Sequence, residues 1–305
     1  MTYSIVARDP GTGDLGVAVQ SHWFAAGIVC WARAGVGAVA SQATMLVDHG
    51  PLALDLLAGG ADAAGALAER IRGDGDRDVR QVAVLDVGGG VAVHTGASCI
   101  PEAGHRTGAG FSCQANMMWR DTVWDAMAGA FASAEGDLAE RMLRALEAAE
   151  AEGGDVRGRQ AARVLVVAGR PSERPWEDVV VDLRVDDHDR PLVELRRLLG
   201  IKRAYDHLQA SEEAATAGDL ELARREVEAA IELAPDNPEI AFWTALGMGT
   251  IGRVREAREL LRAPFAADAG WAELLRRLGD RRLGNVTPEL AEELLVERAE
   301  PATGS

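Results

Sequence analysis

Thr2 is the residue whose chemistry is least ordinary for its position. It follows Met1, and a small second residue permits removal of the initiator methionine, which would leave a threonine with a free α-amine. The hydroxyl could then attack a carbonyl carbon while the amine, of unperturbed pKa about 7.7–8.0, takes its proton. This chemistry is amide hydrolysis without a metal or organic cofactor. Threonine is also common at position 2, so the residue alone does not decide the matter.

A predicted hairpin would position Thr2. Residues 3–8 and 14–20 have strand-like patterns, and the turn at 9–13 contains the Pro and Gly that a chain reversal needs. Ser4 lies two residues after Thr2 and therefore on the same face of the strand. We expect Thr2 at one edge of a buried sheet, with Ser4 as a hydroxyl partner.

The rest of the first 190 residues mixes strand and helix patterns. Apolar runs at 27–33 and 35–40 predict a continuing sheet. Helical leucine spacing over 50–72, interrupted at Gly59 and Gly60, predicts two helices. Further elements are expected as strands at 79–86, 91–95, 163–168 and 179–185, and as two helices over 121–152 with a break near Gly136. This order predicts an α+β fold with helices layered on sheets, rather than regular βαβ alternation.

The chain changes character after Arg190 and has helical patterns to its end, with turn signals at Gly218, 235–238, Gly252 and Pro264. Residues 218–224 align with 252–258 at an offset of 34, and 34-residue helix–turn–helix units are typical of tetratricopeptide repeats. We expect 271–278 and 288–297 to cap the array. An unrelated helical bundle is the alternative. Because such arrays bind peptides or subunits, residues 200–280 are expected to bind a protein partner or to mediate a homo-oligomer.

Composition limits the other classes of partner. The 305 residues suggest two domains, and 48 acidic against 32 basic residues give a net charge of −16. No basic patch is left for phosphates, so we expect neither nucleic acid nor an anionic membrane as partner. No apolar run of ~18 or more residues is visible, so we expect no transmembrane helix, and no signal peptide is visible. Three widely spaced cysteines, Cys30, Cys99 and Cys113, predict reduced core thiols in a cytoplasmic protein.

Two segments match known binding motifs in part, but the residues around them do not fit such sites. Residues 11–16 (GTGDLG) match a dinucleotide-binding pattern but lie in the predicted hairpin turn, without the helix that such a site needs. Residues 74–78 resemble the start of a calcium loop, yet Val79 and Leu85 occupy the positions of its Gly and Glu. The six histidines are scattered, so we expect no metal site and no cofactor.

Four segments, at 1–21, 31–43, 96–118 and 153–167, resemble the bacterial family called domain of unknown function 1028. The resemblance covers about residues 1–195. It implies a four-layer αββα sandwich of the N-terminal-nucleophile (Ntn) hydrolase-like class, followed by a tetratricopeptide-like helical domain at 196–305. Some family members carry a C-terminal segment described as peptidoglycan-binding, which the repeat pattern here replaces.

The resemblance also supplies site residues. In proteasome-type relatives a lysine about thirty residues on assists the N-terminal threonine, whereas this chain has Arg33 there and Lys202 as its only lysine. Arg33 cannot act as a base but could stabilise charge, and Asn116 could donate to an oxyanion. Candidate substrate-binding residues, each of which could instead satisfy buried backbone groups, are Ser4, His22, Gln42, His105 and Gln114.

Two hypotheses result. In the first, the protein is an Ntn-type hydrolase of a small amide or peptide-like substrate, with Thr2, Arg33 and Asn116 as catalytic residues. In the second, the sandwich is a non-catalytic scaffold that acts through its helical repeats.

Overall fold

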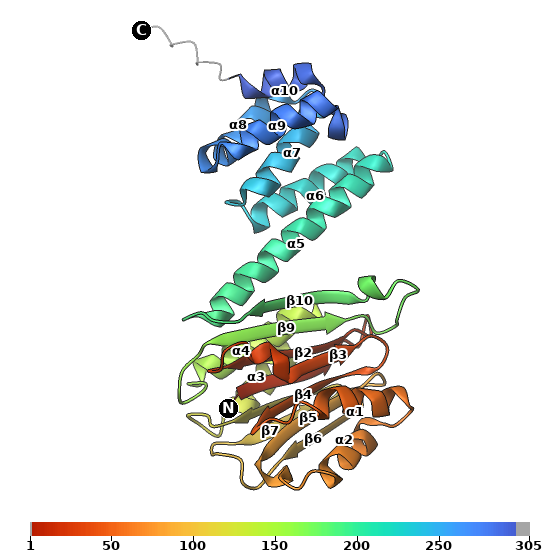
Figure 1. Ribbon diagram of the computed structural model, residues 1–305, viewed down its shortest axis with the longest axis vertical. Coiled ribbons are helices and arrows are strands. Elements are labelled where there is room, and N and C mark those ends of the chain that lie inside the picture. Colours follow the sequence, from red (N-terminus) through yellow and green to blue (C-terminus); the bar gives the residue numbers. More distant parts are fainter. Residues whose placement is uncertain (1, 297–305) are drawn as a thin grey trace. The chain divides into compact units, whose positions relative to one another are not determined.

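The computed structural model describes residues 2–296, and the chain divides into two compact units, Met1–Leu198 and Leu199–Ser305 (Figure 1). The predicted boundary after residue 195 lies three residues before this division.

Two antiparallel sheets form the N-terminal unit. The larger has the order β10-β9-β2-β1-β8-β7 and the smaller the order β3-β4-β5-β6. The strands of the larger sheet are β1 (Thr2–Arg8), β2 (Leu15–Ser21), β7 (Gly104–Gly108), β8 (Phe111–Asn116), β9 (Ala161–Val167) and β10 (Val179–Val185). Those of the smaller are β3 (Cys30–Arg33), β4 (Gly37–Ala43), β5 (Arg80–Asp86) and β6 (Val91–Thr95).

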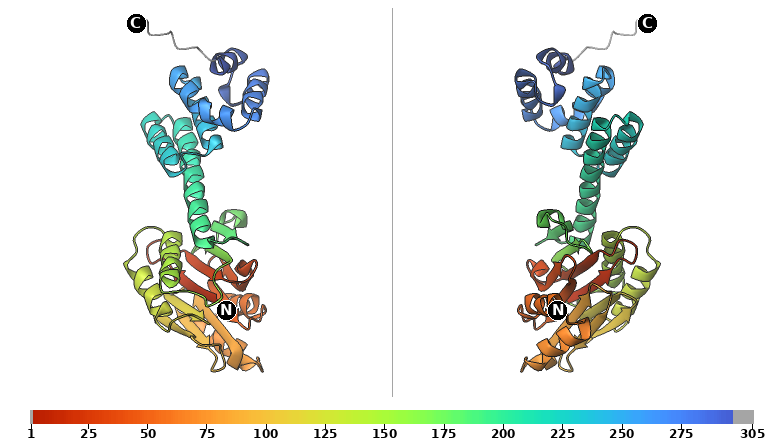
Figure 2. Two further views of the ribbon diagram at one scale, coloured as in Figure 1. Left: turned by 90° about the vertical axis from the view of Figure 1, so that its left-hand side faces the viewer. Right: turned by 90° about the vertical axis from the view of Figure 1, so that its right-hand side faces the viewer.

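Helices cover the outer face of each sheet. On the smaller sheet lie α1 (His49–Ala58) and α2 (Ala63–Arg72), and on the larger lie α3 (Val123–Ser133) and α4 (Leu138–Ala151). Figure 2 shows the two helix pairs on opposite sides of the strands. Asp62 and Asp137 begin α2 and α4 by accepting a hydrogen bond from a backbone N–H of the first turn, which satisfies a donor the helix leaves free.

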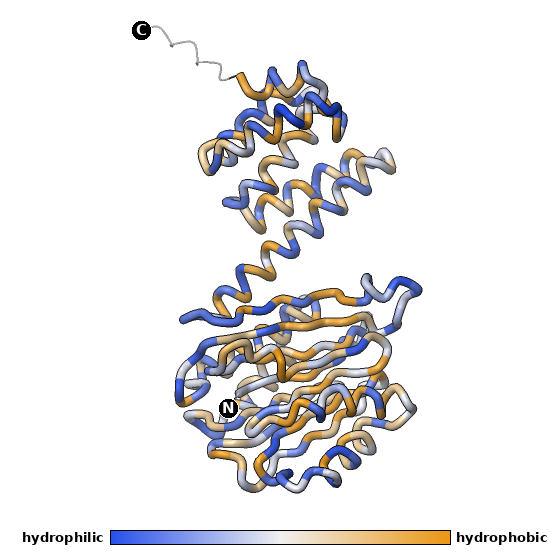
Figure 3. Tube along the Cα trace, viewed as in Figure 1, coloured by the Kyte–Doolittle hydropathy of each residue, from blue (hydrophilic) through white to orange (hydrophobic). Residues whose placement is uncertain are grey.

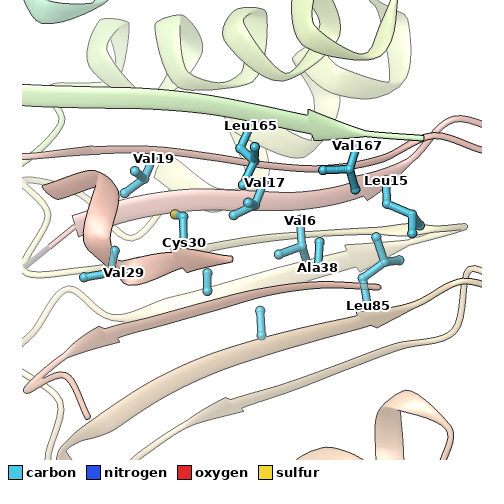
Figure 4. Packing of buried hydrophobic residues seen from close by; sticks show 12 residues of the cluster. Val6, Leu15, Val17, Val19, Val29, Cys30, Ala38, Leu85, Leu165 and Val167 are labelled. Carbon is cyan, nitrogen blue, oxygen red and sulfur yellow. The ribbon is translucent and has the colours of Figure 1, made fainter. Parts of the chain in front are cut away.

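The inner faces of the two sheets pack on each other, and this interior has an apolar part and a polar part. Alternate residues of β1 and β2, such as Val6, Leu15 and Val17, meet Ala38 and Leu85 of the smaller sheet (Figure 4). The same faces carry polar side chains toward the start of β1, where Ser4 takes the position that Val6 holds further along. The hydrophobic contacts therefore align the sheets, while the polar end is left to hydrogen bonds.

The C-terminal unit is helical. The helices are α5 (Pro191–Thr216), which begins in the first unit, α6 (Leu220–Leu233), α7 (Pro238–Thr250), α8 (Val254–Ala267), α9 (Gly270–Arg281) and α10 (Pro288–Leu295). Apolar and polar residues alternate along α5 and α6 (Figure 3). Because α6 and α8 begin 34 residues apart, the sequence repeat corresponds to a repeated helix start.

The mixed α+β composition, the antiparallel sheets and the helical C-terminal region are confirmed. Three details were wrong. Residues 26–29 form a 3₁₀ helix before β3, the strand pair β7–β8 had not been assigned, and Pro264 lies inside α8 instead of at a turn. Pro264 lacks the N–H that would bond to the carbonyl four residues earlier, and α8 ends three residues after it. The expected capping helix at 288–297 corresponds to α10, and its last residue, 297, lies outside the described residues.

Candidate functional site

Thr2 begins β1, a strand enclosed by neighbours on both sides. Its backbone pairs with Asn116 of β8, and its Oγ1 donates to the Oγ of Ser21 at the end of β2, over 3.0 Å. The Thr2 residue is 5% exposed. Since Thr2 and Ser4 share a strand face and Ser4 contacts the smaller sheet, the Thr2 side chain faces the interior between the sheets.

Hydrogen bonds between buried side chains join the two sheets at this polar end. Ser4 Oγ donates to Gln42 Oε1 on β4 over 2.7 Å, and Gln114 Nε2 on β8 donates to Ser4 Oγ over 2.6 Å. All three side chains are almost completely buried. Gln42 and Gln114 therefore bond to protein groups. This arrangement fits a role in positioning their neighbours better than direct contact with a substrate.

Gln81 on β5 is the residue with most partners in this cluster. Its Oε1 accepts from Gln42 Nε2 over 2.7 Å and from Asn116 Nδ2 over 2.9 Å. Its Nε2 donates to Thr95 Oγ1 over 2.9 Å and to two backbone carbonyls. A buried amide can make about four such bonds, so Gln81 is saturated and fixes the positions of its neighbours.

Asn116 has one satisfied end and one free end. Its Nδ2 donates to Gln81 Oε1 and, over 3.3 Å, to the carbonyl oxygen of Thr2. Its Oδ1 is buried and has no hydrogen-bond partner among residues 2–296. Rotating the amide would place oxygen against two acceptors, so the hydrogen bonds define this orientation. The free acceptor lies beside the first residue of β1.

The loop at 153–160 crosses the start of β1. Gly154 O accepts from Trp119 N, just after β8, and Gln160 N donates to Ser21 O at the end of β2 over 3.1 Å. Gly153 and Gly154 have φ of 111° and 61°, a region that glycine enters without strain, and they turn the chain from α4 into this crossing. The loop therefore connects the ends of the two strands that flank Thr2.

A buried ion pair sits in this loop. The Asp155 carboxylate has no exposed surface and accepts from Arg157 Nε over 3.1 Å and Nη2 over 2.8 Å. It also accepts from the backbone N of His22 over 3.4 Å. The His22 Nδ1 is buried and lacks a partner within the described chain. Arg157 is thus an arginine at the Thr2 end of the sheet.

Arg33 lies elsewhere. It pairs with Gly37 at the opposite end of β4 from Gln42, about 16 Å away at a strand rise of ~3.3 Å per residue. Its guanidinium is 43% exposed and bonds to Asp55 over 2.9 Å. The structure does not bring Arg33 to Thr2, so its expected role in stabilising charge there does not fit its position. Spacing from known relatives could not reveal this, because the position depends on the register of β3.

His105 joins the far side of the network. It lies on β7, and its Nδ1 is 2.9 Å from Thr95 Oγ1, which in turn contacts Gln81. Partial burial lowers the pKa of His105, and the charges of His94 and Arg106 add to the effect. His105 therefore favours the neutral form and reaches Thr2 only through several intermediate side chains.

Five residues of this region had not been singled out: Ser21, Gln81, Thr95, Asp155 and Arg157. Gln81 carried a usable signal, because it alternates with Ala83 and Leu85 on the inner face of a predicted strand. Asp155 and Arg157 carried none, since their place depends on the path of a loop. In the part of the chain from 2 to 296, no group of three or more His, Cys, Asp or Glu is placed to hold a metal ion. Over the same residues, no helix is long and apolar enough to span a membrane.

These features define a two-sheet α+β protein with a polar interior at the start of its first strand. The chain belongs to the family of unknown function DUF1028, whose model matches residues 2–195. It is similar to the crystal structure of protein SPO2555 from Silicibacter pomeroyi, also matched to the DUF1028 model. The two share 32% sequence identity and a TM-score of 0.59, over 65% of this chain and 84% of the other. No curated protein matches the chain.

Proposed function

We propose that the N-terminal unit is a four-layer αββα sandwich of the Ntn type that hydrolyses a small amide or peptide-like substrate with Thr2 as nucleophile. The observation that supports this is the place of the Thr2 hydroxyl, at the first residue of an interior strand and 3.0 Å from Ser21 Oγ. The proposal requires that Thr2 become the first residue of the mature chain.

The chemistry follows from the groups present. Thr2 Oγ would attack the amide carbon, its proton would pass to the α-amine, and the same proton would leave with the departing amine. The resulting ester would then be hydrolysed by water, which regenerates the hydroxyl. Asn116 Oδ1, the buried acceptor beside Thr2, would accept an N–H from the α-ammonium. Asn116 would therefore position the amine, a role that replaces the oxyanion donor expected from its sequence.

A non-catalytic scaffold is the second candidate, and one observation favours it. The side-chain amides of Gln42 and Gln81 bond to each other, and that of Gln114 bonds to Ser4 and Ser112. A buried interior that serves only to hold the two sheets rigidly together would show the same bonds. In this version the helical C-terminal unit, with its tetratricopeptide-like offset of 34, carries the activity by binding a partner.

The mature N-terminus and a hydroxyl-acylating β-lactone separate the two candidates. Intact mass should show a chain starting at Thr2, and the β-lactone should add one acyl group to the peptide that contains Thr2. Thr2→Ser should keep the label and Thr2→Ala should lose it, while Thr107→Ala, which changes an exposed threonine on β7, should leave labelling unchanged. A retained Met1, or equal labelling of wild type and Thr2→Ala, would overturn the catalytic proposal.

A further inference from the structure

The C-terminal unit contains an apolar groove of about 520 Å³ between α5, α6 and α7, with part of the 3₁₀ helix at Leu283–Asn285 on its border. Leu208 of α5, Val227 and Ile231 of α6 and Met248 of α7 contribute to its walls. Leu220, on its edge, is 62% exposed. A volume of this size is within the range of about 300–1,000 Å³ that ligand-binding pockets have.

One polar atom in the wall of this groove has no partner. The Thr244 side chain lines the groove, the residue is 3% exposed, and its Oγ1 is buried without a hydrogen bond to any described residue. A threonine in a helix ordinarily bonds to a carbonyl of the preceding turn, and a buried hydroxyl left unpaired is destabilising. The hydroxyl is therefore placed to bond with something that enters the groove.

Charge distinguishes the possible occupants. A second, wider hollow adjoins the groove and shares Leu208, Glu212 and Trp243 with it. Together the two are lined by six carboxylates (Asp206, Glu212, Glu213, Glu221, Glu228, Glu239) and two guanidiniums (Arg224, Arg253). Arg224 is engaged by Glu228 and Arg253 by Glu256. Glu212 borders both hollows, and no Lys, Arg or His nitrogen of residues 2–296 lies within 4.0 Å of its carboxylate.

We infer that this continuous surface binds a cationic, apolar peptide segment of a partner protein. Apolar side chains of the peptide fill the groove, its backbone bonds to Thr244 Oγ1, and a Lys or Arg reaches Glu212. Two joined hollows fit an extended segment better than one compact small molecule. The chain's own residues 297–305 carry Glu297, Arg298 and Glu300, and an acidic tail is the wrong charge for an acidic surface. This inference does not depend on the proposed hydrolase activity.

Gly247 offers a variant that blocks the groove without removing a contact. It lines the groove on α7, and a Cβ placed there would meet nothing within 4 Å. Gly247→Leu should therefore fill the groove, and the helix should persist because leucine is a better helix former than glycine. Glu212→Gln removes the unpaired charge, and its matched control is Glu259→Gln, an exposed glutamate on α8 outside both hollows.

The experiment selects binders from a displayed library of random peptides on the full chain. The peptides are about 15 residues long, and a chain of this length reaches roughly 50 Å when extended. Enriched peptides should combine apolar residues with Lys or Arg. By fluorescence anisotropy they should bind Gly247→Leu at least about tenfold more weakly, a change of ~1.4 kcal/mol, with Glu212→Gln and Thr244→Val also weaker and Glu259→Gln unchanged. Three results would overturn the inference. They are enrichment of acidic peptides or of none, binding that Gly247→Leu does not affect, and binding that appears only after residues 297–305 are deleted. Concentration-dependent dimerisation lost in Gly247→Leu would instead assign the groove to a second copy.

Discussion

Ser4 of β1 and Gln42 of β4 share a 2.7 Å hydrogen bond that joins the two sheets of the N-terminal unit. Both side chains are buried, and the bond lies two residues from the candidate nucleophile. At one end of the interior, the packing of Val, Leu and Ala side chains holds the two sheets together. At the other end, hydrogen bonds between buried side chains do so. Such bonds tolerate little displacement, so the start of β1 is held in one geometry relative to the smaller sheet.

Replacing Gln81 with alanine should strongly destabilise the N-terminal unit. The change leaves the amides of Gln42 and Asn116 without their shared acceptor in a buried place, and orphaned polar groups and a cavity together cost about 2–4 kcal/mol. Urea denaturation followed by tryptophan fluorescence measures this loss. Gln209→Ala, an exposed glutamine on α5, is the control. A loss below about 0.5 kcal/mol would show that the network does little for stability.

The buried cluster of His49, Asp74 and Arg80 predicts loss of stability at acid pH. Burial lowers the pKa of His49, against the opposing hydrogen bond to Asp74. The neutral ring donates Nε2–H to Asp74, and a proton on its Nδ1 would find no acceptor among the described residues. Because the unfolded chain then binds the proton more readily, stability should fall as pH drops below the unfolded value of about 6.5.

Asp74 extends this dependence to lower pH. The Arg80 hydrogen bond, as the largest cause, holds the pKa of Asp74 well below its usual range. Its contribution is present above the unfolded value of about 3.9 and is lost as pH falls further. Melting temperatures measured from pH 7.5 to 3 should show both stages in wild type. His49→Asn should remove only the first, and an unchanged slope between pH 6.5 and 5 in that variant would refute the assignment.

The three cysteines should be inert in the folded protein. Cys30, Cys99 and Cys113 are all buried, and burial raises the pKa of Cys30 to about 12 and raises those of the other two as well. The thiolate, which is the reactive form, is then scarce near neutral pH. Iodoacetamide followed by intact mass should give no adduct under native conditions and three in guanidinium. A native adduct at any one cysteine would indicate local opening there.

Replacing Arg157 should destabilise the protein much more than replacing Arg33. Arg157→Ala leaves the Asp155 carboxylate buried and unpaired, a situation that typically costs about 3–5 kcal/mol. Arg33→Ala breaks an exposed pair with Asp55, which solvent screens to at most about 1 kcal/mol. Thermal unfolding of both variants tests the ranking, and β-lactone labelling should survive Arg33→Ala. Loss of labelling in Arg33→Ala with normal folding would return that residue to the site.

The sequence predicted most elements but only part of the site. Local patterns were sufficient for β1, β2 and the helix pairs, because the hairpin turn and the breaks at Gly59–Gly60 and Gly136 are local signals. β8 was not assigned, although it pairs with β1 and its run FSCQAN alternates apolar and polar residues as a strand does, so a usable local signal was missed. Thr2 and Asn116 are adjacent as pairing partners. The position of Arg33 relative to Thr2 depends on strand register, and that of Asp155 depends on the path of a loop. Patterns in a single sequence contain neither.

Lys202 has an experimental consequence. It is the only lysine of the sequence, it lies on α5 in the helical unit, and Asp206 engages its ammonium over 2.7 Å. Amine-directed isotope tags therefore find a single side-chain target in the whole polypeptide. Any tag recovered from a peptide of the sandwich would report a terminal amine. If the intact protein is tagged before it is digested, mass spectrometry of the peptides identifies the free N-termini of the chain. The background of tagged lysines that other proteins give is then absent.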